Sequence, residues 1–282
     1  MQKLVVAVSG GVDSAVLLDK LVASGEYDLI VAHVDHGIRP DSGEDARLVE
    51  KLATSHNLPF ELTRLSLGAA ASELQAREAR YGFLRQVAKA NQATVATAHH
   101  KDDLYESIAI NLIRGTGWRG LAVLDSPDLI RPLLDMSKAD IIDYAKTHQL
   151  QWREDSTNTD TKFLRNKLRP LMSRLDSMDR QGLEYLHEKQ LAIKKQIEAE
   201  VQQILSSDIE VSSRYFMTMV DESVADELLR KICLDQAPSG TTRIQRQALR
   251  IAIKTLPAGK KHRITGDLWC LVTKDRFTIQ SL

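Results

Sequence analysis

A glycine-rich turn between a buried strand and a helix constrains the fold of this chain more than any other feature. The run LVVAV (4–8) is continuously apolar, as in a strand that is covered on both faces. Ser-Gly-Gly (9–11) follows, and the pattern then predicts a helix over 14–24. Such a turn presents backbone N–H groups at the positive end of a helix dipole, which suits a phosphate. These residues therefore predict the first βα unit of a parallel sheet, with an anion site.

The turn carries an acid and no lysine. SGGVDS (9–14) matches neither G-x-x-x-x-G-K-[ST] nor G-x-G-x-x-G. A carboxylate beside a polyphosphate repels it unless a divalent cation lies between them. We therefore expect a nucleotide with Mg²⁺: the metal on Asp13, and the phosphates on Ser9, Gly10, Gly11, Val12 and Ser14. The alternative is an ordinary tight turn in which Asp13 and Ser14 only open a helix.

Strand and helix patterns alternate through the first half of the chain. Strands are predicted at 4–8, 28–34, 59–65, 93–98 and 129–134, and helices at 14–24, 42–56, 72–90, 102–113 and 137–148. Capping-box spacing is present at Ser42/Asp45, Ser72/Gln75 and Ser137/Asp140. This alternation predicts an α/β, Rossmann-like domain whose parallel sheet has helices on both faces.

The second half predicts a smaller unit. A polar loop at 150–170 leads into a helix, a linker helix is expected over 179–205, and helices at 222–234 and 242–255 precede strands at 262–266, 268–273 and 276–279. We expect a catalytic domain at 1–178 and a small α+β domain at 206–282. From Leu228 onward eleven Lys/Arg stand against three Asp, although the chain is neutral. This asymmetry indicates either a surface for a polyanion or a solvated basic face.

Composition excludes several classes of protein. The chain is 43% hydrophobic, but no apolar stretch approaches the about 20 residues that span a bilayer. The N-terminus lacks a signal-peptide pattern. The two cysteines, Cys233 and Cys270, lie far apart, so a disulfide framework is not expected. We expect a cytoplasmic protein with no membrane partner, and the oligomeric state is open, a homodimer included.

Six motifs together carry a family resemblance. SGGVDS resembles the phosphate loop of the N-type ATP pyrophosphatases, which cleave ATP to AMP and pyrophosphate. The further stretches are AHVDHGIR (32–39), AREARYGFL (76–84), TAHHKDDLYES (97–107), LIRGTGWRGL (112–121) and EDSTNTDTKFLRNKLRP (154–170). In this order the chain resembles the tRNA(Ile)-lysidine synthetase family over about residues 1–175. The resemblance is weaker around LLRKICL and GKKHRITGDLW, as in a short form with one C-terminal domain.

The resemblance implies a two-step ligase reaction. ATP adenylates O2 of the wobble cytidine of a CAU-anticodon tRNA(Ile), and pyrophosphate leaves. The amine of free L-lysine then attacks C2 and expels AMP, giving lysidine, which changes the codon read from AUG to AUA. Cytosine O2 is a poor leaving group, whereas AMP is a good one.

The resemblance also implies roles for individual residues. Asp13 is expected to hold Mg²⁺, Asp103 to bind Mg²⁺ or substrate, and His100 to be a polar active-site group. Arg114 is expected to meet the charge on pyrophosphate, or else to pair with a surface acid. His33 ends a strand, where a parallel sheet places ligands; it is expected on adenosine, or else bonded to nearby backbone. Asp35 is expected on the lysine ammonium or the metal, or in a turn before Gly37. Glu154 is expected to bind lysine, with a solvated loop as the alternative, and Arg165 is expected to contact the substrate. Contact with tRNA is expected from Lys260, Lys261 and Arg263, and contact with tRNA or ATP from Arg77, Arg80 and Tyr81. Asp102 is expected to cap a helix.

Two departures and two rival functions follow from the same residues. Leu104 and Ser107 stand where the family usually has Gln and Thr, which puts any polar contact at Leu104 in doubt. A tRNA thiolase is one rival, but such relatives generally need cysteines near the site, and both cysteines here lie in the tail. A catalytically silent tRNA-binding protein is the other, and the intact phosphate loop speaks against it.

Overall fold

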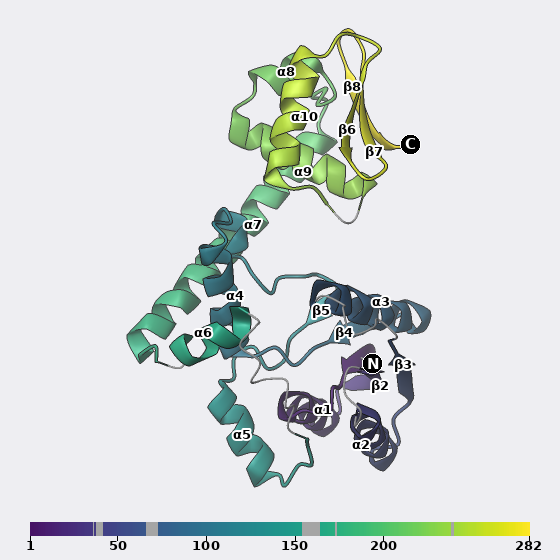
Figure 1. Ribbon diagram of the computed structural model, residues 1–282, viewed down its shortest axis with the longest axis vertical. Helices are drawn as coiled ribbons and strands as arrows, with labels where there is room; N and C mark the ends of the chain where they lie inside the picture. The colour runs from purple at the N-terminus through teal and green to yellow at the C-terminus, as the bar shows by residue number, and fades with distance from the viewer. Residues whose placement is uncertain (36, 38–41, 66–72, 154–163, 173, 238–239) are drawn as a thin grey trace. The chain divides into compact units, whose positions relative to one another are not determined.

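The chain divides into two compact units. The computed structural model describes residues 1–35, 37, 42–65, 73–153, 164–172, 174–237 and 240–282 (Figure 1). Unit 1 comprises Met1–Leu191 and unit 2 comprises Ala192–Leu282. Across the described ranges, no helix is both long and apolar enough to cross a bilayer.

A five-stranded parallel sheet forms the centre of unit 1. Its strands are β1 (Gln2–Ala7), β2 (Tyr27–Asp35), β3 (Phe60–Arg64), β4 (Thr94–Ala96) and β5 (Leu129–Ile130), in the order β3-β2-β1-β4-β5. Val6 pairs with Val31 on one side and with Ala96 on the other. The strand order reverses between β1 and β4, and such a switch point leaves a crevice at the carboxyl ends of the strands.

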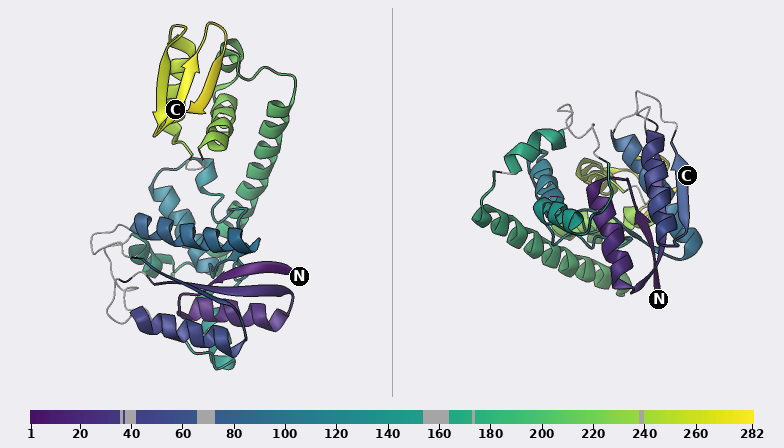
Figure 2. Two further views of the ribbon diagram at one scale, coloured as in Figure 1. Left: turned by 90° about the vertical axis from the view of Figure 1, so that its right-hand side faces the viewer. Right: turned by 90° about the horizontal axis from the view of Figure 1, so that it is seen from below.

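Helices cover both faces of this sheet, as predicted. The helices that lie wholly in unit 1 are α1 (Val12–Ser24), α2 (Ser42–Ser55), α3 (Glu73–Asn91), α4 (Lys101–Ile113), α5 (Lys138–Thr147) and α6 (Leu164–Met172), with a 3₁₀ turn at Trp118–Gly120. α4 and α6 pack against each other. α1 and α2 pack on one face and α3 on the other (Figure 2). The pleat of β1 explains this: Leu4 and Val6 pack in the core on the α1 side, while Val5 packs with Leu84 of α3.

Capping boxes were predicted at the starts of three helices, and the structure confirms the one at the start of α5. Ser137 and Asp140 form the expected capping box of α5, in which Asp140 N donates to Ser137 Oγ at 3.2 Å. The Ser42 hydroxyl bonds to the carboxylate of Asp35. Ser72 lies outside the described residues.

A 30-residue helix, α7 (Ser177–Ser206), occupies the region of the expected linker. In its first half, Leu183 packs against a cluster that contains Leu104 and Ile108 of unit 1. In its second half, Val201 belongs to the core of unit 2. The boundary between the two compact units therefore falls inside this helix, and each half is part of a core.

Unit 2 is a small α+β fold, as predicted. Its strands β6 (Lys261–Thr265), β7 (Leu268–Val272) and β8 (Phe277–Ser281) form an antiparallel sheet, and its helices are α8 (Arg214–Met219), α9 (Glu222–Gln236) and α10 (Arg243–Thr255). Apolar side chains on alternate strand positions face the core that the helices complete. Cys233 and Cys270 are buried there, and burial raises the pKa of their thiols to about 11 and about 12. The short helix α8 was not expected from the sequence.

Candidate active site

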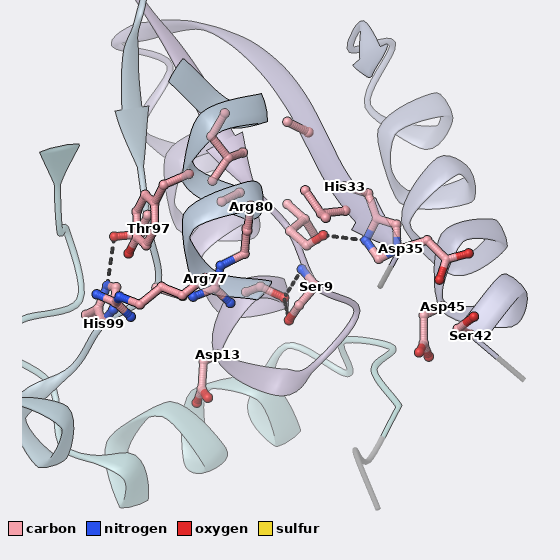
Figure 3. Close-up of a pocket in the computed structure, with 18 of the residues that line it drawn as sticks. Ser9, Asp13, His33, Asp35, Ser42, Asp45, Arg77, Arg80, Thr97 and His99 are labelled. Atoms are coloured by element: carbon pink, nitrogen blue, oxygen red, sulfur yellow. Dashed lines mark hydrogen bonds between the residues drawn. The ribbon is translucent and has the colours of Figure 1, made fainter. Parts of the chain in front are cut away.

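A cavity of about 430 Å³ opens at the carboxyl ends of β1, β2 and β4, beside the switch point (Figure 3). The glycine-rich turn forms its floor, and α2 and α3 contribute walls. Polar and apolar groups share the lining, and the polar side chains are those of Ser9, Asp13, Ser14, His33, Asp35, Ser42, Asp45, Arg77, Arg80, Tyr81, Thr97, His99 and Asp103. The fold thus gathers residues from four of the six motifs at one edge of the sheet.

The turn is shaped to present backbone amides. Gly10 has φ 92°, a conformation that side chains disfavour, and Gly11 is the N-cap of α1. The Ser14 hydroxyl donates to Gly11 O at 2.9 Å and accepts from Ser9 N at 3.1 Å. Because these bonds lie within the loop, the loop is held before any ligand binds. Its amides at the start of a 13-residue helix make an anion site.

Two carboxylates and a histidine meet beside this turn. His100 Nε2 lies 3.9 Å from Asp13 Oδ1 and 3.6 Å from Asp103 Oδ2, so both predicted metal-binding acids face the same imidazole nitrogen. Asp103 Oδ2 also accepts from His100 N at 3.1 Å, which caps α4. Asp102 caps a different helix from the one expected, since its Oδ2 accepts from the first backbone amide of α5, Lys138 N, at 2.8 Å.

His33 and Asp35 lie in the cavity wall and are also bonded to the protein. His33 is buried, and its Nδ1–H donates to Val8 O at 2.7 Å, which leaves Nε2 as an acceptor. Asp35 Oδ1 accepts from Gly37 N at 2.8 Å, the turn considered as its alternative role, and Oδ2 accepts from Arg64 Nε at 2.8 Å. Burial opposes ionisation of Asp35, but the bonds from Gly37, Ser42 and Arg64 outweigh it and hold the pKa of the carboxyl below its usual value. Asp35 is therefore a fixed negative charge.

Adjacent histidines have pKa values shifted in opposite directions. Burial lowers the pKa of His99 to about 4. The negative charge of Asp103 opposes this shift, and the positive charges of Arg131, Arg77 and Arg80 add to it. Burial also disfavours charge on His100, but the Asp102 carboxylate, 3.6 Å from Nδ1, and the charges of Asp103 and Asp13 raise the pKa of His100 above the usual 6.5. His99 is neutral at pH 7, with Nδ1 bonded to Thr97 Oγ1 at 2.9 Å.

This contrast predicts the pH dependence of stability. Between pH 6.5 and about 4 only the unfolded chain protonates at His99, so we expect this residue to lower the free energy of unfolding as pH falls through that range. The contribution of His100 is fully present below pH 6.5 and is lost as pH rises through its folded pKa. Imidazole NMR titrations check the two pKa values, and unfolding of His99→Gln should lack the acid-side loss. A common midpoint near 6.5 for both rings would contradict this assignment.

A basic wall faces the carboxylates across the cavity. Arg77 and Arg80 project from α3 into it, and their guanidinium groups lie 4.9 and 5.4 Å from the ring centre of Tyr81 (Figure 3). Leu84, one turn further along α3, is buried in the core. A wall of this kind suits a phosphate group.

Several predicted residues lie elsewhere. Arg114 is the exposed C-cap of α4, whose N-cap is His100, so about 20 Å of helix separates them. Glu154 lies outside the described residues, as does the side chain of Arg165, whose backbone belongs to α6. Lys260, Lys261 and Arg263 belong to unit 2. Leu104 is buried in an apolar cluster, so packing accounts for the departure from glutamine there.

One residue at the site was missed by the sequence reasoning. Lys138, the first residue of α5, places its ammonium in contact with the carboxylate of Asp13. A lysine from 125 positions further along the chain thus reaches the glycine-rich turn, which carries none of its own. The one sequence feature that could have indicated Lys138 is its position: the start of α5 follows strand β5, just as the glycine-rich turn follows strand β1, so both lie at the carboxyl edge of the sheet.

Comparison with known proteins agrees with this arrangement. The PP-loop domain family matches residues 1–175, which contain the turn and the cavity. The chain belongs to the PP-loop family. ATP use by this domain follows from that membership. The U34-tRNA thiolase NcsA of Methanococcus maripaludis shares the fold, with a TM-score of 0.59 at 17% identity over 68% of this chain and 72% of that one.

Curated relatives are closer in sequence. A tRNA(Ile)-lysidine synthase of Exiguobacterium sibiricum is 41% identical over 184 residues, covering 62% of this chain and 44% of that protein. One of Geobacter sulfurreducens is 41% identical over 197 residues, covering 62% and 41%. The chain spans about two fifths of the length of these relatives. The N-type ATP pyrophosphatase fold expected from the sequence is confirmed.

Proposed function

We propose that this PP-loop protein is a tRNA(Ile)-lysidine synthetase. The observation that carries the proposal is the 41% identity to enzymes of that name across the unit that holds the cavity. In the proposed reaction ATP adenylates O2 of the wobble cytidine in a CAU-anticodon tRNA(Ile), and free L-lysine then displaces AMP. The codon read changes from AUG to AUA.

The site residues divide this work. The amides of the turn and the hydroxyls of Ser9 and Ser14 bind the phosphates, with the positive end of α1 directed at them. His33 Nε2 accepts a hydrogen bond from the adenosine. The basic wall of Arg77 and Arg80 holds a phosphate of the RNA strand, which would place the wobble base against the α-phosphate.

The carboxylates suit a Mg²⁺ ion. Asp13 and Asp103 converge on one nitrogen, and Mg²⁺ is typically held by one or two carboxylates together with substrate phosphates and waters. Among the residues that the structure describes, no three or more His, Cys, Asp or Glu side chains are arranged to hold a metal ion by themselves, so the phosphates would complete such a site. When bound, Mg²⁺ supplies the countercharge for the pyrophosphate that leaves.

Asp35 and Glu154 are the proposed binding groups for the ammonium of lysine. Asp35 is ionised and fixed by Gly37 and Arg64 in the cavity wall, so it offers a preformed negative charge. Arg165 is proposed to contact the substrate and Arg114 to stabilise charge on pyrophosphate. Because Arg114 lies at the far end of α4, its role requires a movement of that segment or contact with RNA instead.

Lysine incorporation tests the function directly. Purified protein with ATP, Mg²⁺, radiolabelled lysine and CAU-anticodon tRNA(Ile) should transfer label to the RNA. The same tRNA with a GAU anticodon is the matched control and should stay unlabelled. If folded protein that binds ATP transfers no label, the proposed function is wrong. ATP–pyrophosphate exchange in the presence of RNA separates the enzyme from a silent RNA-binding protein.

The thiolase alternative has little support in the chain. Both of its cysteines are buried in the core of unit 2, and neither belongs to the PP-loop domain. The similarity to a solved thiolase concerns the fold alone.

Unit 2 carries the proposed tRNA contact. Across Ala192–Leu282 there are fourteen Lys/Arg and eleven Asp/Glu, a net charge of +3, because acids before Leu228 offset the basic tail. Arg230, Arg246 and Arg250 are paired with such acids. The exposed cations on the hairpin are different: Lys261 and Arg263 flank Trp269, each 5.9 Å from its ring centre. We propose this hairpin face, with Lys260 beside it, as the RNA contact.

Reversing charge on the hairpin face should weaken RNA binding. We expect Lys261→Glu/Arg263→Glu to lower tRNA affinity at least about tenfold at low salt, and to reduce the slope of log affinity against log salt by roughly 2, since two phosphate contacts are lost. Fluorescence anisotropy over a salt series measures both quantities. Lys195→Glu, at an exposed position on α7, is the matched control. An unchanged slope would exclude the hairpin from phosphate contact.

A further inference from the structure

The glycine-rich turn receives a cation from the start of α5. Lys138 Nζ contacts Asp13 Oδ1, and the side chains of the two residues are 40% and 33% exposed. Asp13 belongs to the first turn of α1, whose free amides form the anion site. The ammonium is therefore held beside the place where a polyphosphate would lie.

Backbone contacts fix the base of this lysine. Asp102 Oδ2 accepts from Lys138 N at 2.8 Å, and Lys101 N donates to Met136 O at 2.9 Å. These bonds tie the start of α5 to the start of α4, which also carries His100 and Asp103. Lys138 thus has a fixed backbone and a partly exposed side chain, so the ammonium can change partner without a change in fold.

The charges around Asp13 require such a change of partner. Without nucleotide, Lys138 compensates the carboxylate. A metal ion on Asp13 would displace the ammonium, because both bind the same oxygen. The polyphosphate would then be within reach of the released ammonium, because Asp13 belongs to the helical turn whose amides form the anion site.

We propose that Lys138 is the phosphate-binding lysine of this loop. It pairs with Asp13 while the site is empty and turns to the phosphates of ATP when Asp13 takes Mg²⁺. This inference rests on the proposed function, since it names a contact of the same ATP site. In this arrangement Lys138 provides the positive charge that the residues of the loop lack, and Asp13 is available for the metal.

The decisive experiment measures ATP affinity by calorimetry with Mg²⁺ present, in two backgrounds. Lys138→Met keeps the aliphatic length and removes the charge. It should weaken ATP binding roughly 10- to 100-fold, as for a lost charge-assisted hydrogen bond, both in the wild type and in Asp13→Asn. Lys138→Arg should recover part of the affinity. Lys146→Met, an exposed lysine on the same helix, should leave it unchanged.

The Asp13→Asn background separates direct from indirect action. If Lys138→Met weakens ATP binding in the wild type but not in Asp13→Asn, the lysine acts only through Asp13 and the proposal is wrong. Equal ATP affinity of Lys138→Met and wild type also overturns it. Melting temperatures show whether each variant is folded, and Lys138→Gln, which also removes the charge, stands in if Lys138→Met is not.

A second measurement tests the exchange of partners. Mn²⁺ binding without nucleotide, followed by electron paramagnetic resonance, should be several-fold tighter in Lys138→Met, because no ammonium competes for Asp13. Weaker or equal Mn²⁺ binding would refute the exchange. These readouts do not depend on lysine transfer to RNA. Wild-type protein that binds ATP but makes no lysidine would therefore refute the proposed function and leave this inference open to measurement.

Discussion

Asp13→Asn is expected to lower tRNA- and ATP-dependent pyrophosphate release by at least about 100-fold. The substitution keeps the shape of the side chain and removes the charge that would hold Mg²⁺ against the leaving pyrophosphate. It also removes the partner of Lys138 and one of the two carboxylates near His100 Nε2. Release is measured with a coupled pyrophosphatase assay.

The matched control is Asp143→Asn, an exposed acid on α5, which should keep wild-type release. Circular dichroism should show both variants folded, since the Asp13 side chain is partly exposed and asparagine is tolerated in the first turn of a helix. Release within tenfold of the wild type in Asp13→Asn would refute a metal role for this residue. Recovery of the lost activity at high Mg²⁺ would place the defect in metal affinity, as we expect.

Arg214→Met is expected to destabilise unit 2 by roughly 3 kcal/mol. The guanidinium of Arg214, at the start of α8, donates to five backbone carbonyls. Three of them, Ile253 O, Lys254 O and Leu256 O, lie at the carboxyl end of α10, where helix carbonyls lack helical partners. The other two, Thr273 O and Lys274 O, lie between β7 and β8. One charged side chain therefore ties the helix layer to the sheet.

Native-state hydrogen exchange measures this effect within unit 2. The free energy of opening of the slowest amides in α10 and β7 should fall by the stated amount. Arg214→Lys, which keeps the charge but not the planar fork, should lie between the two proteins. Arg243→Met, at an exposed position of α10, should change the opening free energy by under about 0.5 kcal/mol. A loss below 1 kcal/mol in Arg214→Met would mean that water replaces most of these bonds.

Local patterns predicted the sheet of unit 1 well. LVVAV indicated a strand buried on both faces, and β1 lies at the centre of the sheet with Val5 and Val6 fully buried. The period of the apolar residues also located α1 to α5 to within a few residues. α8 was missed because six residues are too few to show a helical period.

Charge patterns were less reliable than apolar patterns. The basic tail from Leu228 suggested a strongly positive module, yet several of its arginines pair with acids from α7 and α9. All of these acids precede Leu228, and Glu198 and Asp226 lie 32 and 20 positions from the arginines that they pair with, so a count over the tail alone overestimates its exposed charge. The cations of the hairpin face remain exposed because their strand lies at the edge of the sheet.

The sequence by itself determined the type of site, because the conformation of the turn SGGVDS is set by its own residues. Gly10 adopts the positive φ that the turn needs, and Ser9 and Ser14 are hydrogen-bonded to each other within the loop. It also determined which strands carry His33 and His99 to the same edge. Only the tertiary structure decided the partners of the charged groups. Lys138 reaches Asp13, and Arg64 reaches Asp35, across 125 and 29 positions. Such contacts depend on the packing of α5 against α1 and on the pairing of β2 with β3, which no local pattern specifies.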